Sequence, residues 1–177
     1  MAARKKTKAA RAAARATQRA SKPVAAGQDA IALLEADHRE VDGWFDDYEA
    51  LDADADKKAL AAKICLALKV HTQIEEELFY PPARQETGDT DLLDEAVVEH
   101  AGAKNLIAEI EAMQPGQPLY DAKVKVLGEQ VRHHVEEEET ELFPEVRETD
   151  IDLDALGAKL AARKAELMAL LAPAAAA

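Results

Sequence analysis

Apolar residues recur at steps of three and four along most of the chain, which is the spacing of one face of an α-helix. The first amphipathic stretch, for example, has Ile31, Leu34, Val41 and Phe45 on one stripe. Polar or proline-containing breaks separate five such stretches. The predicted helices lie at about residues 29–51, 56–80, 90–113, 118–147 and 153–171.

The breaks between these helices are short, and this favours antiparallel neighbours. Asp54 or Asp56 can cap the second helix. Pro81 and Pro82 are expected to stop or kink it, and Pro118 suits the first position of the fourth helix. The pattern predicts an all-α protein, an up-down-up-down four-helix bundle whose second and fourth helices lie diagonally opposite. The leucine-rich fifth helix is expected to pack outside this bundle.

The composition supports one helical domain in a chain of 177 residues, with only seven glycines, seven prolines and 4% aromatic residues. We expect the domain at residues 28–172, with a core bundle at 29–147 and an added helix at 153–171. The single cysteine, Cys65, lies in an apolar run and is expected to be a buried hydrophobe. No apolar stretch approaches the ~18 residues of a membrane span, and the N-terminus lacks the apolar segment of a secretory signal. We therefore expect a cytoplasmic protein.

Charge is distributed very unevenly along the chain. Residues 1–22 contain eight basic residues and no acidic one, whereas the remainder has 14 basic and 35 acidic residues. Residues 1–27 lack large apolar side chains before Val24, so we expect a disordered or fraying segment. The alternatives are a solubilising tail, a segment that folds back on its own acidic domain, a tether for nucleic acid or an acidic partner, and an organelle transit peptide.

One histidine–glutamate pair occurs twice in nearly matching contexts. The sequence HTQIEEELFYP contains His71 and Glu75, and HHVEEEETELFP contains His134 and Glu138. In each copy the glutamate follows the histidine by four residues, and a proline follows it by ten. A further histidine precedes each pair, His38 by 33 residues and His100 by 34.

The doubled pattern predicts a metal site, because residues four apart share one helix face. His71 with Glu75 and His134 with Glu138 would face each other across the bundle, and the two other histidine-bearing helices would close the ring. Four imidazoles and two carboxylates suit two ions, which the carboxylates can bridge. Mixed nitrogen and oxygen ligation favours iron or manganese, and an apolar core would not otherwise accept these six side chains. The six predicted ligands are His38, His71, Glu75, His100, His134 and Glu138.

Other polar residues compete with this assignment. His133 has Glu137 at the same four-residue step, but the distance to proline favours His134, which leaves His133 as a flanking residue. The glutamates around the chosen pair are expected to be solvated, because the chain is rich in acidic residues. They are Glu76, Glu77, Glu136, Glu137 and Glu139.

These motifs resemble the hemerythrin-like HHE cation-binding domain family over roughly residues 29 to 147. The resemblance rests on the order His, His-x-x-x-Glu, His, His-x-x-x-Glu, with LFYP and LFP after the pairs. It implies a four-helix bundle with a non-haem di-iron centre, oxo- or hydroxo-bridged. It also implies that the four histidines are terminal ligands and that Glu75 and Glu138 bridge the two iron ions.

The chain departs from the oxygen carriers of that family at one place. They have a second histidine four residues further along the third helix, where this chain has Lys104. Water, peroxide or another side chain can take the open position, and Tyr48 and Tyr80 are the candidate phenolates. An open position favours turnover, so we expect disproportionation or reduction of hydrogen peroxide. The alternatives are reversible binding of O2 or NO or iron sensing without turnover, and an acidic body tethered to DNA by its basic tail.

Overall fold

The computed structural model describes residues 28–172, so the predictions for residues 1–27 lie outside it. The described part contains helices and no strand. The helices are α2 (Ala30–Glu49), α3 (Asp54–Ile74), α4 (Tyr80–Thr87), α5 (Thr90–Glu111), α6 (Tyr120–Glu137), α7 (Phe143–Arg147) and α8 (Leu153–Leu171). Two single-turn π-helices, η1 (Glu75–Phe79) and η2 (Glu138–Leu142), join α3 to α4 and α6 to α7.

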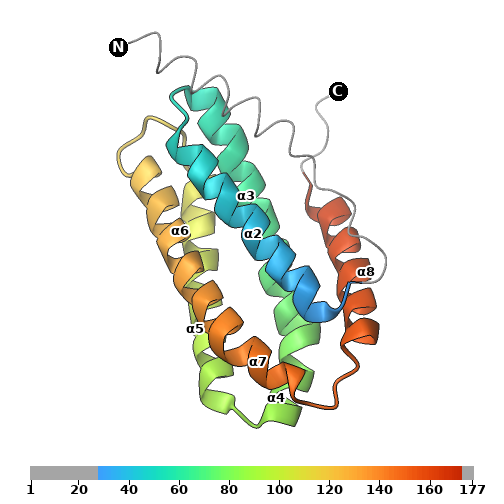
Figure 1. Ribbon diagram of the computed structural model, residues 1–177. Coiled ribbons are helices and arrows are strands. Elements are labelled where there is room, and N and C mark those ends of the chain that lie inside the picture. The colour runs from blue at the N-terminus through green and yellow to red at the C-terminus, as the bar shows by residue number, and fades with distance from the viewer. Residues whose placement is uncertain (1–27, 173–177) are drawn as a thin grey trace.

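The long helices form the predicted up-down-up-down bundle (Figure 1). Helix α2 packs against α3 and α6, and α5 packs against the same two helices, so that α3 and α6 are diagonal. Helix α8 lies outside the bundle, over α2 and α3. The predicted diagonal pair and the added outer helix are both confirmed. Within residues 28–172 no helix is both long and apolar enough to cross a membrane.

The helix starts follow local capping chemistry. Asp29, Asp89 and Asp152 each accept a hydrogen bond from a backbone N–H three residues later, which satisfies a free donor of the first turn. Helix α3 is different, because Ala53 is its N-cap and no side chain caps it. The predicted cap by Asp54 or Asp56 is therefore wrong.

The start of the fourth long helix also differs from the prediction. Helix α6 begins at Tyr120, and Leu119 before it has a φ of 73°, in the left-handed region. Pro118 therefore lies ahead of the helix and is not its first residue. Leu119 therefore reverses the chain direction just before α6. Its left-handed backbone conformation is strained for a residue that has a β-carbon.

The two π turns begin at the two glutamates of the repeated motif. The backbone N–H of Tyr80 donates to the carbonyl of Glu75, and that of Phe143 donates to the carbonyl of Glu138, each five residues back. A π turn widens the helix by one residue, and such turns are frequent at functional sites. After the first one the chain stays helical through Pro81 to Thr87. Pro81 therefore does not end the helix.

Two apolar clusters occupy the two ends of the bundle. One includes Trp44, Phe45 and Leu127, and it also contains Cys65, which is buried as expected. The other includes Phe79 and Phe143 and is extended by leucines of α8. Between the two clusters lies a belt of buried polar side chains.

Candidate metal centre

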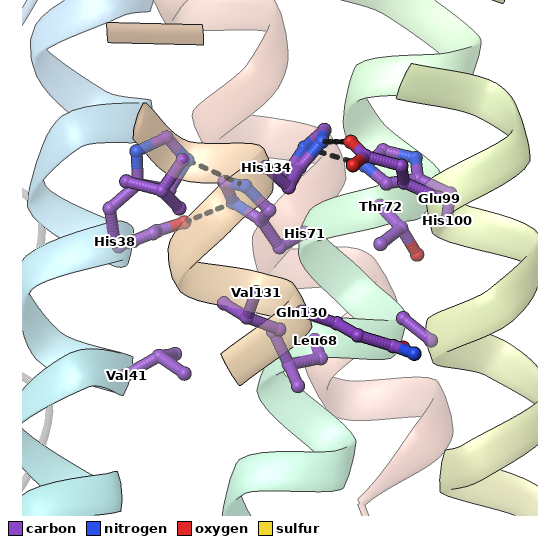
Figure 2. Close-up of a pocket in the computed structure, with 13 residues that line it drawn as sticks. His38, Val41, Leu68, His71, Thr72, Glu99, His100, Gln130, Val131 and His134 are labelled. Atoms are coloured by element: carbon purple, nitrogen blue, oxygen red, sulfur yellow. Dashed lines mark hydrogen bonds and ion pairs between the residues drawn. The ribbon is translucent and has the colours of Figure 1, made fainter. Parts of the chain in front are cut away.

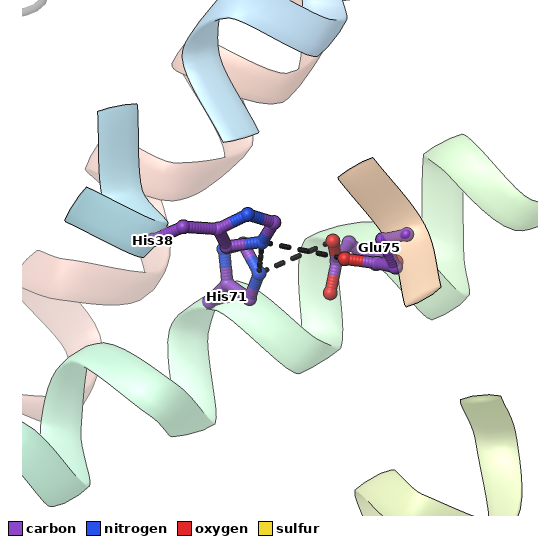
Figure 3. A group of neighbouring side chains, drawn as sticks. His38, His71 and Glu75 are labelled. Atoms are coloured by element: carbon purple, nitrogen blue, oxygen red, sulfur yellow. Dashed lines mark hydrogen bonds and ion pairs between the residues drawn. The ribbon is translucent and has the colours of Figure 1, made fainter. Parts of the chain in front are cut away.

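The polar belt contains the six predicted ligands, which the bundle brings to one place. They come from α2, α3, η1, α5, α6 and η2, and all six are buried, with Glu75 fully inaccessible. Figure 3 shows the His38 and His71 rings turned toward the Glu75 carboxylate. The four-residue step places His71 and Glu75 on one face of α3 and its π continuation, and the diagonal helix repeats this arrangement.

The distances between the donor atoms fit ligands that share a cation. The Nε2 atoms of His38 and His71 are 3.1 Å apart, as are those of His100 and His134. Two ligands at right angles on one ion, with metal–imidazole bonds of about 2.1 Å, lie about 3 Å apart. Two Nε2 atoms at this distance are more simply explained as two ligands of one ion than as a lone hydrogen bond.

The two carboxylates lie between the imidazole pairs. Glu75 approaches His71 Nε2 with Oε1 (3.1 Å) and His100 Nε2 with Oε2 (3.4 Å). Glu138 Oε2 lies 3.3 Å from His38 Nε2 and 3.5 Å from His134 Nε2. Each carboxylate therefore lies close to one histidine of each hairpin.

Several buried polar atoms in this belt have no hydrogen-bond partner among the described residues. They include both carboxylate oxygens of Glu75 and Oε2 of Glu138. A buried carboxylate without a partner is costly, and a cation in the belt would remove that cost. The donor atoms form two groups that could each hold an ion, one with His38, His71, Glu75 and Glu138 and one with Glu75, His100 and His134. The residues present therefore fit a dinuclear metal site.

An outer ring of carboxylates faces the other nitrogen of each imidazole. Glu139 lies 2.9 Å from His38 Nδ1, and Glu76 lies 2.9 Å from His100 Nδ1. Both glutamates are partly exposed to solvent, as expected, but each also contacts an imidazole, which was not predicted from the sequence. They follow the inner glutamates by one residue, which turns them about 100° around the helix axis, and there each meets the histidine of a neighbouring helix. The sequence contained a signal for them, since both motifs have glutamate directly after the inner glutamate.

The residues before the first histidines complete this outer ring. Glu99 Oε2 lies 2.8 Å from His134 Nδ1, and Asp37 Oδ2 lies 3.6 Å from His71 Nδ1. The recurrence of an acid before His38 and before His100 reflects this contact. An acceptor at Nδ1 leaves Nε2 free for a metal and fixes the ring orientation.

These charges shift the pKa values of the imidazoles. Burial by itself lowers the pKa of a histidine, but the carboxylates outweigh burial at His38, His71 and His134 and raise the pKa, at His71 to about 10. At His100 burial prevails and lowers the pKa. Burial alone would raise the pKa of Glu138, but His134 and His38 lower it to about 2.

Tyr80 is the one aromatic hydroxyl that reaches the inner cluster in the described part of the chain. It donates to Glu138 Oε1 at 2.9 Å, and its oxygen lies 3.3 Å from His100 Nε2. Its ring stacks on His100, whereas Phe143, at the matching place in the second motif, stacks on His38. Burial, with Glu75 and Glu138 adding to it, raises the pKa of Tyr80, which therefore stays protonated. The repeat thus has a hydroxyl beside His100 and none beside His38.

Two other residues considered from the sequence lie away from the inner cluster. Lys104 donates to both carboxylate oxygens of Glu76 and so supports the outer ring. Tyr48 donates to Asp121 at 2.8 Å, within the apolar end of the bundle, so the Tyr48 alternative is wrong. His133 has a side chain that is 62% exposed, and His134 is the residue that points inward.

A small cavity of about 30 Å³ adjoins the imidazoles. Figure 2 shows the histidines along one side of it and Val41, Leu68 and Val131 along the other. One water needs roughly 10–15 Å³ by this kind of measure. The cavity therefore has room for a molecule of about two heavy atoms against the histidine side chains.

Comparisons with known proteins agree with this geometry. The family model described as Hemerythrin HHE cation binding domain matches residues 29–146. The chain therefore belongs to the hemerythrin HHE cation binding domain family, and the buried histidine and glutamate cluster is its candidate cation site.

Two individual proteins show how far the similarity extends. The structure is similar to a crystal structure of a Hemerythrin HHE cation binding domain-containing protein from Mycobacterium kansasii, with a TM-score of 0.70, 24% identity, and coverage of 81% of this chain and 89% of that chain. At this identity the likeness shows the fold alone. The chain is also 30% identical over 115 residues, 65% of its length, to a Nostoc protein named DNA nickase. The match spans only 32% of that protein's length.

Proposed function

We propose that the six inner residues hold two iron ions and that the protein consumes hydrogen peroxide. In this proposal the four histidines are terminal ligands and Glu75 and Glu138 bridge the ions. The proposal is supported by the mixed imidazole and carboxylate donors, which suit iron, and by the two groups of converging donor atoms. A cytoplasmic location remains part of the proposal.

The observation that carries the peroxide proposal is the Tyr80 hydroxyl, which lies among the inner residues. It is held by Glu138 and stacked against His100, at the half of the cluster where oxygen carriers have one more imidazole. Reducing the O–O bond of peroxide to water consumes protons, whereas reversible binding of O2 needs no net proton. A protonated phenol hydrogen-bonded to an inner carboxylate can supply a proton, which suits the first chemistry.

The other residues would prepare this site for a small substrate. Glu139, Glu76 and Glu99 hold the Nδ1 side of their histidines, and the apolar wall of Val41, Leu68 and Val131 limits the water that enters. When bound, the metal pair would supply the electron transfer of the balanced reaction, two H2O2 giving two H2O and O2. The cavity volume of about 30 Å³ restricts the substrate to a diatomic core.

Oxygen evolution tests this proposal. Hydrogen peroxide is added to iron-loaded protein in an oxygen electrode, and the visible spectrum of the metal centre is followed. We expect O2 release that falls about tenfold in Tyr80→Phe, since a hydrogen bond to a charged partner is worth about 1.5–3 kcal/mol. Tyr48→Phe is the matched control, because Tyr48 is also buried and also donates to a carboxylate. No O2 release from the parent protein would refute the proposal.

Reversible binding of O2 or NO is the second candidate function. It is favoured by the small size of the cavity, in which Val41, Leu68 and Val131 form an apolar wall opposite the histidines (Figure 2). Under this alternative the reduced, iron-loaded protein would bind NO or O2 with a change in the visible spectrum and release it under vacuum, with no peroxide consumed. Iron sensing would instead appear as a conformational change on binding iron.

Contact with a polyanion through residues 1–27 is a separate proposal. It is supported by the eight basic residues in that segment and by the printed name of the Nostoc relative. Retention on a DNA column should fall steeply with salt. Removal of residues 1–27 should abolish it, and equal retention without them would exclude the tether.

A further inference from the structure

The two hairpins of the bundle differ on their outer faces. Helix α8 covers the groove between α2 and α3, where Leu33, Val70 and Ile74 are buried with its leucines. In the second hairpin the equivalent positions lie on the surface between α5 and α6. They are occupied, in the same order, by Glu95, His133 and Glu137. Among the described residues no helix covers this second surface. The apolar cover of one hairpin is thus replaced by ionisable side chains on the other.

On the hairpin covered by α8, a lysine side chain pairs with one of the outer carboxylates. The Lys164 ammonium of α8 donates to Asp37, the carboxylate that faces His71. Its matched residue, Glu99, faces His134 at 2.8 Å. Within residues 28–172 no lysine or arginine forms an ion pair with Glu99. The same outer carboxylate therefore has a built-in cation on one hairpin and none on the other.

The side chains beside Glu99 are arranged as metal ligands. His133 Nε2 lies 3.4 Å from Glu137 Oε1 and 3.8 Å from Glu99 Oε1, and all three donor atoms lie within 4.8 Å of one another. Ligands with bonds of about 2.1 Å to one ion lie roughly 3–4 Å apart. Glu99 uses Oε2 for His134 and has Oε1 left for this group.

We propose that Glu99, His133 and Glu137 form an exposed divalent-cation site that captures metal ions on their way to the buried cluster. The ion would take the place that Lys164 has on the other hairpin. The imidazole favours a metal ion over an ammonium group as the occupant, because its ring nitrogen can coordinate a divalent transition metal together with the two carboxylates. Glu99 links the two sites, since it also lines the cavity beside the buried histidines. The inference rests on the proposed binding of metal by the buried cluster and is independent of peroxide chemistry.

Cobalt(II) bound to the metal-free full-length chain tests the proposal, because its visible absorption reports coordination. Equilibrium dialysis should give two tightly held ions and a third, weaker one. The third should be lost in His133→Gln and in Glu137→Gln. The matched control is Glu136→Gln, which removes the same charge from the neighbouring exposed position and should keep all three ions. Two tight ions in every variant show that the bundle is intact.

Loading kinetics test the capture role. At low cobalt concentration the rate of filling the buried cluster should fall about tenfold in His133→Gln, because the capture site loses one of its three ligands and no longer raises the local metal concentration, with the same final absorbance. A third ion in His133→Gln, only two in the parent chain, or an unchanged loading rate would each overturn the proposal. A third ion that appears only after residues 1–27 are deleted would also overturn it, because the basic segment would then be the occupant.

Discussion

The two hairpins share their inner residues and differ in what covers them. Each supplies two histidines, one inner glutamate and two outer carboxylates, at matching positions. Outside this ring, the α2–α3 hairpin is sealed by α8, whereas the α5–α6 hairpin has Glu95, His133 and Glu137 at the surface. The inner cluster therefore constrains the identity only of the residues that face it. The outer residues follow from whether another helix packs there.

Removing an inner carboxylate should have the largest effect, because both hairpins depend on it. We expect Glu138→Gln to lower the iron content from two ions per chain to less than about a tenth of that, since a neutral amide cannot offset the cations as a carboxylate does. Metal analysis after loading and desalting measures this. Glu136→Gln, at an exposed position on the opposite face of the helix from the cluster, should keep both ions. Full iron content in Glu138→Gln would argue that the ions lie elsewhere.

The effect of removing an outer carboxylate on metal affinity should decrease as its distance from the imidazole increases. Glu99→Gln is expected to weaken metal affinity about 10–100-fold, the usual effect of losing such a partner. Asp37→Asn should have a smaller effect, because Asp37 lies 3.6 Å from His71 and Glu99 lies 2.8 Å from His134. Competition with a chromophoric chelator gives both affinities. An equal loss in the two variants would contradict the ranking.

A pair of glycines probes the packing of the two hairpins. A β-carbon at Gly157 of α8 would lie 2.5 Å from the backbone oxygen of Gln28, so we expect Gly157→Ala to lower the free energy of unfolding by about 1–3 kcal/mol. A β-carbon at Gly102 of α5 would have only Gln130 within reach, at 3.8 Å. Gly102→Ala should be stabilising by up to about 1 kcal/mol. Chemical denaturation compares them, and equal stabilities would mean that α8 does not pack tightly.

The smallest expected effect is the pH dependence of the thermal stability that bound metal adds. The raised pKa of His71, about 10, means that its protonation stabilises the metal-free fold fully below the unfolded value near 6.5. That contribution is lost as the pH rises toward 10. Bound metal needs the neutral ring, so the Tm difference between metal-loaded and metal-free protein should widen from pH 6.5 to 9.5. Calorimetry at both pH values measures it, and a constant difference would show that His71 is already neutral in the metal-free protein.

The sequence predicted the inner ring well, because its signals are local. A four-residue step fixes which side chains share a helix face, and the ten-residue distance to proline favoured His134, which is buried, over His133, which is exposed. The diagonal placement of the second and fourth long helices followed from the short connections. The capping of α3 and the start of α6 were predicted wrongly, since several residue types can satisfy a helix terminus.

The outer ring and Tyr80 were predicted less well, for a geometric reason. Glu76 and Glu139 lie one residue beyond the inner glutamates, where a regular α-helix turns a side chain away from the face that holds its neighbour. Only the packing of the bundle places a histidine of a neighbouring helix on that side. Tyr48 and Tyr80 were equal candidates by composition, and only packing distinguished them.

By itself the sequence determined the helices, their order and the six residues of the inner cluster, because periodicity and spacing act within one helix. The tertiary structure decided which carboxylate faces which imidazole, that Tyr80 rather than Tyr48 reaches the cluster, and that α8 covers one hairpin and leaves the other open. These contacts join residues far apart in the chain. Their distances depend on how the helices pack against one another, which no local sequence pattern specifies.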